Sequence, residues 1–158
     1  NIMKNKNILL LLCILIPLAV GGIAALLTRE GMMTYQMMRQ PVLAPPAWLF
    51  PVVWTILYIL MGISSYLIMS ADVEMKEKER AILLYEYQLA VNFLWPTFFF
   101  SFQWYFFSFL WLLLLWILVF LMILSFWKID KRAAKLNIPY LIWLTFAAYL
   151  NLAVWWLN

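Results

Sequence analysis

Residues 45–62, PPAWLFPVVWTILYILMG, open a long apolar run with a proline pair and with more aromatic surface than a lipid anchor needs. Trp48, Trp54 and Tyr58 recur at spacings that bring them to one face of a helix. Proline is well tolerated in a first helical turn, where its missing N–H would have no partner. The stretch therefore predicts a membrane helix that begins near residue 48 and turns aromatic rings toward a flat, apolar ligand.

The composition places the whole chain in a lipid bilayer. Hydrophobic residues make up 68% of the 158 positions, charged residues only 11%, and the mean hydropathy is +0.93. A soluble domain is about half apolar and a quarter charged. The fold class expected is therefore an all-α membrane protein. Aromatic residues reach 19%, with 10 tryptophans, and several lie too deep in the apolar runs to form only an interfacial belt.

The residues that are missing exclude several kinds of site. The sequence has no histidine, and Cys13 is its single cysteine. Disulfides within the chain, zinc clusters and histidine-ligated haem are excluded. We expect no metal site, no required cofactor and no nucleic-acid partner.

Five apolar stretches are long enough to cross a bilayer core of about 30 Å. They cover about 8–27, 48–70, 82–102, 105–127 and 137–157. The separators are short, so residues 1–158 predict one domain, a bundle of five transmembrane helices. Gly21 and Ala25 form a small-xxx-small pair, which suits either packing within one bundle or a dimer seam.

The loop charges predict the orientation of the chain. Nine of the eleven Lys and Arg residues fall in the N-terminal segment and in the loops 71–81 and 128–136. Arg29 and Arg39 stand alone in the loop 28–47. Because cytoplasmic loops are enriched in Lys and Arg, we expect a multi-pass cell-membrane protein with a cytoplasmic N-terminus and an external C-terminus. Lys4 and Lys6 before an apolar run also fit a signal peptide, although we favour a retained helix.

Polar residues of the third apolar stretch share one helical face. Gln88, Asn92 and Trp95 follow at i, i+4 and i+7, and polar side chains inside a bilayer turn toward protein or a cavity. Pro96 cannot donate to the carbonyl of Asn92. An amide, a freed carbonyl and an indole would then meet within one turn. The alternative is a kinked helix whose amide bonds to a neighbouring helix.

The last apolar stretch repeats the combination of rings and small residues. Tyr140, Trp143, Ala147 and Leu150 recur on one stripe. A large ring beside a small alanine leaves a gap that could hold a planar guest, while ordinary interdigitation of small and large residues explains the pattern equally well. Aromatic walls with a few polar atoms suit an apolar ligand with polar handles.

Acid–base machinery is missing from the apolar stretches. None holds a pair of carboxylates, and Ser64-Ser65 has no activating base. Indoles and phenols remain, and these can take part in radical or photo-oxidative chemistry. An enzyme is therefore not the first expectation, and a scaffold whose rings only pack stays an alternative.

Three ordered motifs resemble the TspO/MBR family, the tryptophan-rich sensory proteins that include the mitochondrial translocator protein. The similarity runs from about Tyr35 to Trp155. The motifs are Pro45-Pro46-x-Trp48 continuing to Pro51-x-Val53-Trp54-x-x-Leu57-Tyr58-x-x-Met61-Gly62, then Gln88-Leu89-x-x-Asn92-x-x-Trp95-Pro96, and then Ala133-Ala134-x-Leu136-x-x-Pro139-Tyr140-x-x-Trp143-x-x-Phe146 with Leu150-Asn151.

The resemblance implies a five-helix bundle, commonly a homodimer, that binds tetrapyrroles such as protoporphyrin IX and, in some members, cholesterol. It implies that Trp54, Asn92 and Trp143 border the pocket and that the loop 28–47 covers it. In some bacterial members the two tryptophans support light-dependent porphyrin breakdown. The run 150–156 lacks the tyrosine and the basic residue of the cholesterol-type motif.

These considerations lead to one leading function and two alternatives. We expect a membrane protein that binds metal-free protoporphyrin IX or a similar apolar ligand, in tetrapyrrole handling or stress sensing. The alternatives are light-dependent porphyrin degradation with Trp54 and Trp143 as electron donors, and passive transport of hydrophobic metabolites. Arg29, Tyr35 and Arg39 are expected in the loop lid. The predicted ligand-binding set is Trp48, Trp54, Tyr58, Gln88, Asn92, Trp95, Trp143, Ala147 and Leu150.

Overall fold

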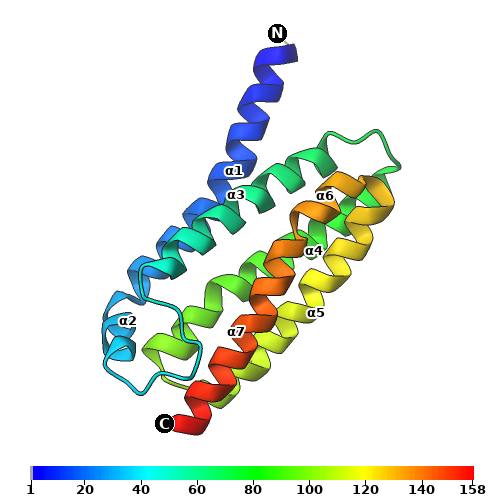
Figure 1. Cartoon of the computed structure of the whole chain (residues 1–158). Coiled ribbons are helices and arrows are strands. Elements are labelled where there is room, and N and C mark those ends of the chain that lie inside the picture. Colours follow the sequence, from blue (N-terminus) through cyan, green and yellow to red (C-terminus); the bar gives the residue numbers. More distant parts are fainter. Residues whose placement is uncertain (1) are drawn as a thin grey trace.

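The fold is known from a computed structural model that describes residues 2–158, with side chains described from residue 5 onward. Every regular element in this part of the chain is helical (Figure 1). The elements are α1 (Ile2–Leu27), α2 (Arg29–Gln36), α3 (Leu49–Met69), α4 (Met75–Pro96), the π-helical turn η1 (Thr97–Ser101), α5 (Tyr105–Ile129), α6 (Lys131–Leu136) and α7 (Ile138–Leu157). The all-α prediction is confirmed.

Four segments of the described chain are long and apolar enough to cross a membrane. They are Asn5–Leu27, Leu49–Met69, Tyr105–Ile129 and Lys131–Leu157. α4 is not among them, because its first turns carry the charged run Lys76–Arg80. The chain is thus a multi-pass helical membrane protein, and a fifth crossing by α4 stays a prediction.

Two of the predicted connectors contain helices that the sequence analysis did not predict. The loop 28–47 holds α2, and 128–136 holds α6. Asp130 caps α6, since its carboxylate accepts a hydrogen bond from the Arg132 backbone N–H at 2.9 Å. The Arg132 guanidinium also donates to this carboxylate, at 2.8 Å, and it holds the pKa of Asp130 below its usual range.

The end of α4 departs from regular α-helix where Pro96 stands. Proline offers no N–H to the preceding turn, and the chain continues as the π turn η1, with the Phe102 N–H bonded to the Thr97 carbonyl at 2.9 Å. The predicted span 82–102 is therefore helical throughout most of its length but changes its pitch at its aromatic end. This change brings Phe99 and Phe100 beneath α2.

Close backbone contact joins α1 to α3, and it depends on glycine. A Cβ on Gly62 would lie 2.5 Å from the Ile14 Cα. Gly21 likewise faces the ring of Tyr58, which leaves no room for a side chain. Gly21 thus packs within the bundle, which was one of the two roles expected for the Gly21/Ala25 pair. The other role, a dimer seam, stays a prediction.

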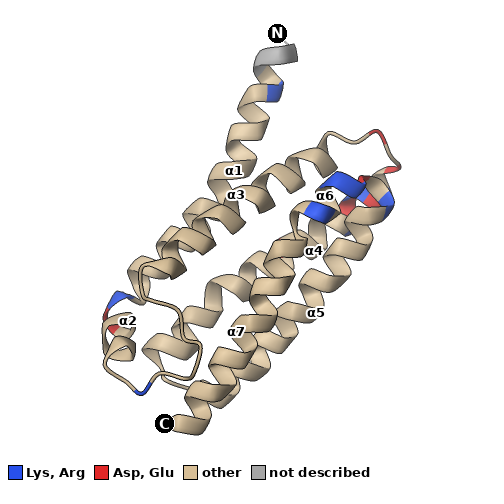
Figure 2. Cartoon of the chain, in the orientation of Figure 1, with Lys and Arg blue, Asp and Glu red and all other residues tan. Residues whose placement is uncertain are grey.

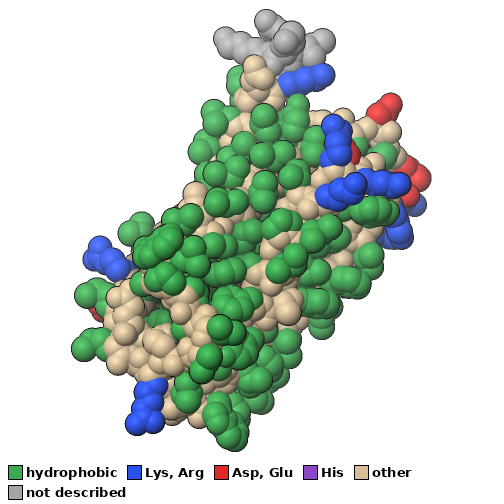
Figure 3. Space-filling model, in the orientation of Figure 1, with side chains coloured by type: hydrophobic (Ala, Val, Ile, Leu, Met, Phe, Trp, Pro, Cys, Tyr) green, Lys and Arg blue, Asp and Glu red, His purple; other side chains and the backbone are tan. Residues whose placement is uncertain are grey.

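The helices α4, α6 and α7 all pack against α5. α6 also joins α5 to α3. The first turns of α1 extend beyond the bundle (Figure 1). Large apolar side chains cover the flanks, as in a surface that faces lipid (Figure 3).

The charged side chains gather at two ends of the bundle. Figure 2 shows the larger group at the α3–α4 connection and around α6, and a small group on and after α2. Lys6 lies in the first turns of α1, while the side chain of Lys4, which contributes to the predicted orientation, lies outside the described ones. The two groups of charged residues that the orientation prediction uses therefore lie at different ends of the bundle. Which end faces the cytoplasm stays a prediction.

Candidate functional site

Rings from α3 and α7 meet in one aromatic cluster, which we define as Phe50, Trp54, Tyr58, Tyr140 and Trp143. Trp54 stacks on Tyr58 with ring centroids 5.5 Å apart and an angle of 29°. Its edge contacts bring it to 6.1 Å from Tyr140 and 6.5 Å from Trp143, and Phe50 lies 5.9 Å from Trp143. Such offset and edge-to-face geometries are the favourable ones for aromatic pairs.

The aromatic cluster bridges two helices whose backbones make little direct contact. α3 packs on α1 and α6, whereas α7 packs on α5. The distance between α3 and α7 is therefore set by side chains. Phe146 continues the row of rings, 5.6 Å from Trp143. A row of rings between two helices is a surface that another flat ring can join or replace.

A chain of buried hydrogen bonds lies beneath the aromatic cluster and joins α3, α4 and α7. The Tyr58 hydroxyl donates to the Asn92 Oδ1 at 2.8 Å, and the Asn92 Nδ2 donates to the Tyr140 hydroxyl at 2.7 Å. The Tyr140 hydroxyl in turn donates to the Gln88 Oε1 at 2.8 Å. We call these four residues the polar chain. All four are at least nine-tenths buried.

The direction of the polar chain is fixed by its last member. The Gln88 Nε2 lies 3.8 Å from the Met61 sulfur, and a thioether only accepts. The Gln88 oxygen must then face Tyr140, which donates to it and can accept only from the Asn92 amide nitrogen. The Asn92 oxygen consequently faces Tyr58 and the aromatic cluster, where it offers an acceptor.

One polar atom of the aromatic cluster has no partner within the described chain. The Trp143 indole N–H is buried and unpaired. An unmade hydrogen bond of a buried group costs about 1–3 kcal/mol, so this donor can gain free energy from an acceptor on a guest. The cluster therefore presents an acceptor at Asn92, which a guest reaches by displacing Tyr58, and a free donor at Trp143.

Trp95 belongs to a second polar group, nearer the π turn. Its indole N–H donates to the Asn151 Oδ1 at 3.0 Å, and the Asn151 Nδ2 donates to the Tyr105 carbonyl at 2.7 Å. Its ring stacks on Phe99 with centroids 4.9 Å apart. Trp95 therefore contacts α7 directly and is linked to α5 through Asn151.

The loop 28–47 is held against the bundle by several separate contacts. The Tyr35 ring lies 5.5 Å from both Phe99 and Phe100, and Gly31 packs on the Phe100 backbone. The Tyr149 hydroxyl donates to the Val42 carbonyl at 2.6 Å. Burial, with a smaller contribution from Tyr105, raises the pKa of Tyr35.

The two arginines of this loop are exposed at the same end of the bundle (Figure 2). The Arg39 carbonyl accepts from the Asn158 side chain at 3.3 Å, which ties the loop to the end of α7. Leu43 adopts a left-handed backbone conformation with φ of 71°, a strained position that loops reserve for tight turns. The loop is thus tied to η1 and to α7 by separate contacts.

The structure brings most of the predicted binding residues together but not all of them. Trp54, Tyr58, Gln88, Asn92 and Trp143 meet in the aromatic cluster or the polar chain. Ala147 and Leu150 follow Trp143 along α7. Ala147 is partly buried, and Leu150 is buried. Trp48 stands at the N-cap of α3, 66% exposed and outside the cluster.

Tyr140 is the central residue that the predicted set leaves out. It is fully buried and contacts both Trp54 and Asn92. The sequence placed Tyr140 on the same helical stripe as Trp143. It did not show how deeply this stripe is buried in the bundle. Phe50, whose ring contacts Trp143 from α3, was also not predicted.

Two hollows of the described chain lie away from the aromatic cluster and the polar chain. They measure about 310 and 300 Å³ and lie on either side of α4 at the charged end. Neither is lined by a residue of the aromatic cluster or the polar chain.

These observations define a multi-pass helical membrane protein with an aromatic cluster joined to a buried polar chain, and with a loop that packs on η1 and α7. The model of the TspO/MBR family matches residues 13–157, and the chain belongs to this family.

Curated relatives cover similar lengths. The chain is 38% identical over 156 residues to the tryptophan-rich protein TspO of Chlorobaculum tepidum, across 98% of this chain and 99% of that protein. It is 38% identical over 124 residues to Protein CrtK of Rhodobacter capsulatus, across 78% of each. The human translocator protein is 35% identical over 127 residues, across 80% of this chain and 75% of that protein.

Proposed function

We propose that this chain binds metal-free protoporphyrin IX, or a similar flat tetrapyrrole, between α3 and α7, and acts in tetrapyrrole handling or stress sensing. The observation that carries the proposal is the aromatic cluster, in which rings of α3 and α7 meet next to a buried amide. When a planar ligand binds, contacts between two protein rings would be replaced by contacts between a protein ring and the ligand. Each such contact is worth about 0.5–1.5 kcal/mol beyond area burial.

Two polar groups would orient the guest. The unpaired Trp143 N–H would donate to an acceptor of the ligand. The Asn92 oxygen would accept from a pyrrole N–H once Tyr58 swings aside, since the polar chain fixes which Asn92 atom faces the cluster. The guest would thus keep the buried amide satisfied, which a purely apolar molecule cannot do.

The loop 28–47 would act as the lid, and its arginines would form the rim. A porphyrin carries propionates, which need a cationic or wet surface. Arg29 and Arg39 lie exposed at the lid end of the bundle. Charge reversal at both positions would lower porphyrin affinity, and unchanged affinity would remove them from the rim.

The membrane topology that fits this function has five crossings. α4 and η1 together span 27 residues between two connections at opposite ends of the bundle (Figure 1), and the apolar part of α4 lies between the charged turns and Pro96. We place the N-terminus in the cytoplasm, the C-terminus outside, and two copies in a homodimer. Protection of a C-terminal tag from external protease would contradict this orientation.

The experiment is a titration of detergent-purified protein with protoporphyrin IX in the dark, followed by tryptophan quenching and porphyrin absorption. Wild type is compared with Trp143→Phe and Asn92→Leu. Trp156→Phe, a change at a 79% exposed ring, is the matched control. Saturable one-site binding that both cluster variants weaken, and the control does not, supports the proposal. Non-saturable binding, or indifference to both changes, would mean that porphyrin only partitions into the micelle.

A second candidate, light-dependent porphyrin degradation, has one specific observation in its favour. The rings of Trp54 and Trp143 lie 6.5 Å apart and nearly perpendicular, so an electron removed from one indole can be replaced from the other. Under light and dioxygen, wild type would bleach the porphyrin visible bands faster than Trp54→Phe or Trp143→Phe. Equal bleaching in protein-free micelles would exclude it.

A further inference from the structure

A groove between α4 and α5 combines an apolar floor with a basic mouth. It measures about 300 Å³ and lies at the charged end of the bundle, away from the aromatic cluster. Leu84 of α4 and Leu121 and Leu124 of α5 line its apolar part, and Arg80 and Lys128 line its mouth.

Helical spacing sets this order along both walls. Arg80 precedes Leu84 by four residues on α4, and Lys128 follows Leu124 by four residues on α5. Because α4 runs away from the charged end and α5 runs toward it, both cations stand about one turn, roughly 6 Å, nearer that end than the leucines. The two positive charges therefore meet at one level above a single apolar groove.

Three cations near this groove, Arg132, Lys131 and Lys135, already have partners in the described chain. The Arg132 guanidinium pairs with Asp130 at 2.8 Å. The ammonium groups of Lys131 and Lys135 lie 5.5 and 5.9 Å from the centre of the Trp127 ring, within reach of a cation–π attraction.

Arg80 and Lys128 differ from these cations. Neither forms an ion pair in the part of the chain that the structure describes, although Glu77 lines the same groove. Their charges are consequently free to meet an anion from outside the protein.

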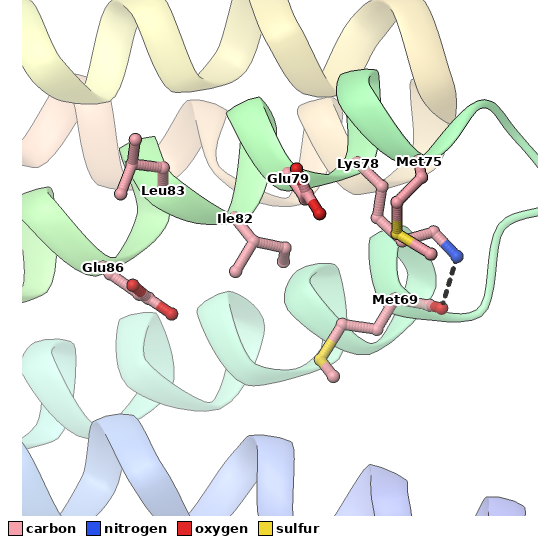
Figure 4. Close-up of a pocket in the computed structure, with 7 residues that line it drawn as sticks. All are labelled: Met69, Met75, Lys78, Glu79, Ile82, Leu83 and Glu86. Carbon is pink, nitrogen blue, oxygen red and sulfur yellow. Dashed lines mark hydrogen bonds between the residues drawn. The ribbon is translucent and has the colours of Figure 1, made fainter.

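The opposite side of α4 carries a groove of similar size and opposite charge. It measures about 310 Å³, and Glu79 and Glu86 face it beside Ile82 (Figure 4). Its one cation, Lys78, donates to the Met69 carbonyl at 3.0 Å. α4 is thus flanked by two apolar grooves that a lipid could reach, and only the one on the α5 side offers unpaired positive charge.

We propose that the groove between α4 and α5 binds one anionic phospholipid of the bilayer. An acyl chain lies along Leu84, Leu121 and Leu124, and the phosphate sits between Arg80 and Lys128. Alkyl chains match the leucine floor, and basic pockets between membrane helices are suited to anionic headgroups. The site is independent of porphyrin binding, because it shares no residue with the aromatic cluster.

The test is native mass spectrometry of protein released from bilayers that contain equal amounts of phosphatidylglycerol and phosphatidylcholine. Wild type is expected to retain the anionic lipid about tenfold more often than the neutral one. The double variant Arg80→Gln/Lys128→Gln should bring the two lipids close to parity. Lys131→Gln/Lys135→Gln removes the same charge from the same end and should keep the preference.

Two further arms separate this site from a general surface attraction. Leu124→Trp fills the apolar floor and should lower retention of the anionic lipid while Arg80 and Lys128 remain. Excess inorganic phosphate should leave the lipid in place, since the acyl chain holds it.

Three results would overturn the proposal. They are an unchanged preference in Arg80→Gln/Lys128→Gln, an equal loss in both double variants, or complete displacement of the lipid by inorganic phosphate. An unchanged helical circular dichroism spectrum and unfolding temperature in all variants verify that the bundle is folded. Because this control does not depend on porphyrin binding, this proposal and the porphyrin proposal fail separately.

Discussion

The two seams that α3 makes with its neighbours are built in opposite ways. Against α1, Gly62 lets backbones approach until a Cβ would lie 2.5 Å from the Ile14 Cα. Against α7, the contact runs through Trp54 and Trp143, whose ring centroids are 6.5 Å apart. Backbone contact through a glycine leaves nothing that can be exchanged, whereas rings can be replaced by another ring. The difference indicates which side of α3 is fixed and which side can open.

The largest expected effect comes from breaking the fixed seam. Gly62→Val places methyl groups against the Cys13 and Ile14 backbone, and overpacking of this kind costs about 3 kcal/mol. We expect a lower unfolding temperature by circular dichroism in detergent. Gly22→Ala is the control, because nothing lies within 4 Å of its Cβ position, and it should stabilise slightly. Equal tolerance of both changes would refute the close seam.

The polar chain should be the next most sensitive element. Asn92→Leu leaves the Tyr58 hydroxyl without its acceptor and the Tyr140 hydroxyl without its donor. The expected loss of stability is about 2 kcal/mol, together with weaker porphyrin binding. Thr55→Val, which removes a hydroxyl bonded only within its own helix, should change neither measurement.

Trp143→Phe sharpens the comparison because it should separate stability from binding. It removes ring volume and also a buried unpaired N–H. These two effects oppose each other, so the unfolding free energy should change by less than about 1 kcal/mol. Porphyrin affinity should fall about tenfold. A large stability loss with unchanged affinity would make Trp143 a packing residue.

The smallest expected effect lies in the lid. Tyr149→Phe removes the hydrogen bond to the Val42 carbonyl, worth about 1 kcal/mol. Amide hydrogen exchange of residues 37–47 should become about fivefold faster. Tyr87→Phe, at an exposed ring of α4, is the control, and equal exchange rates in both variants would remove Tyr149 from the lid.

Apolar runs and prolines predicted the long helices well. The expected spans 48–70 and 105–127 correspond to Leu49–Met69 and Tyr105–Ile129. The start of α4 at Met75 was not expected, because its charged turns read as a solvated connector. Lys, Glu and Arg are nevertheless good helix formers, so the helix extends beyond the apolar stretch.

The sequence predicted which helical face the residues of the candidate site share, but not which residues they bond to. Helical periodicity placed Gln88 and Asn92 on one inward face, and both are buried there. Which hydroxyl each amide would meet depends on how α3, α4 and α7 are rotated, and one helix's period cannot give that rotation. Tyr140 was left out of the predicted set for this reason, and Trp48 lies outside the cluster because it precedes the first turn of α3.

The most direct test measures whether the ring-bridged seam opens for its guest while the glycine seam does not. Spin labels at the exposed positions Val52 and Ile142 report the α3–α7 distance, and labels at Val52 and Leu26 report α3 against α1. At saturating protoporphyrin IX in the dark, the account predicts that the first distance grows by about 3–4 Å, the thickness of one stacked ring, and that the second stays constant. Two unchanged distances at saturation, or equal changes in both, would contradict it.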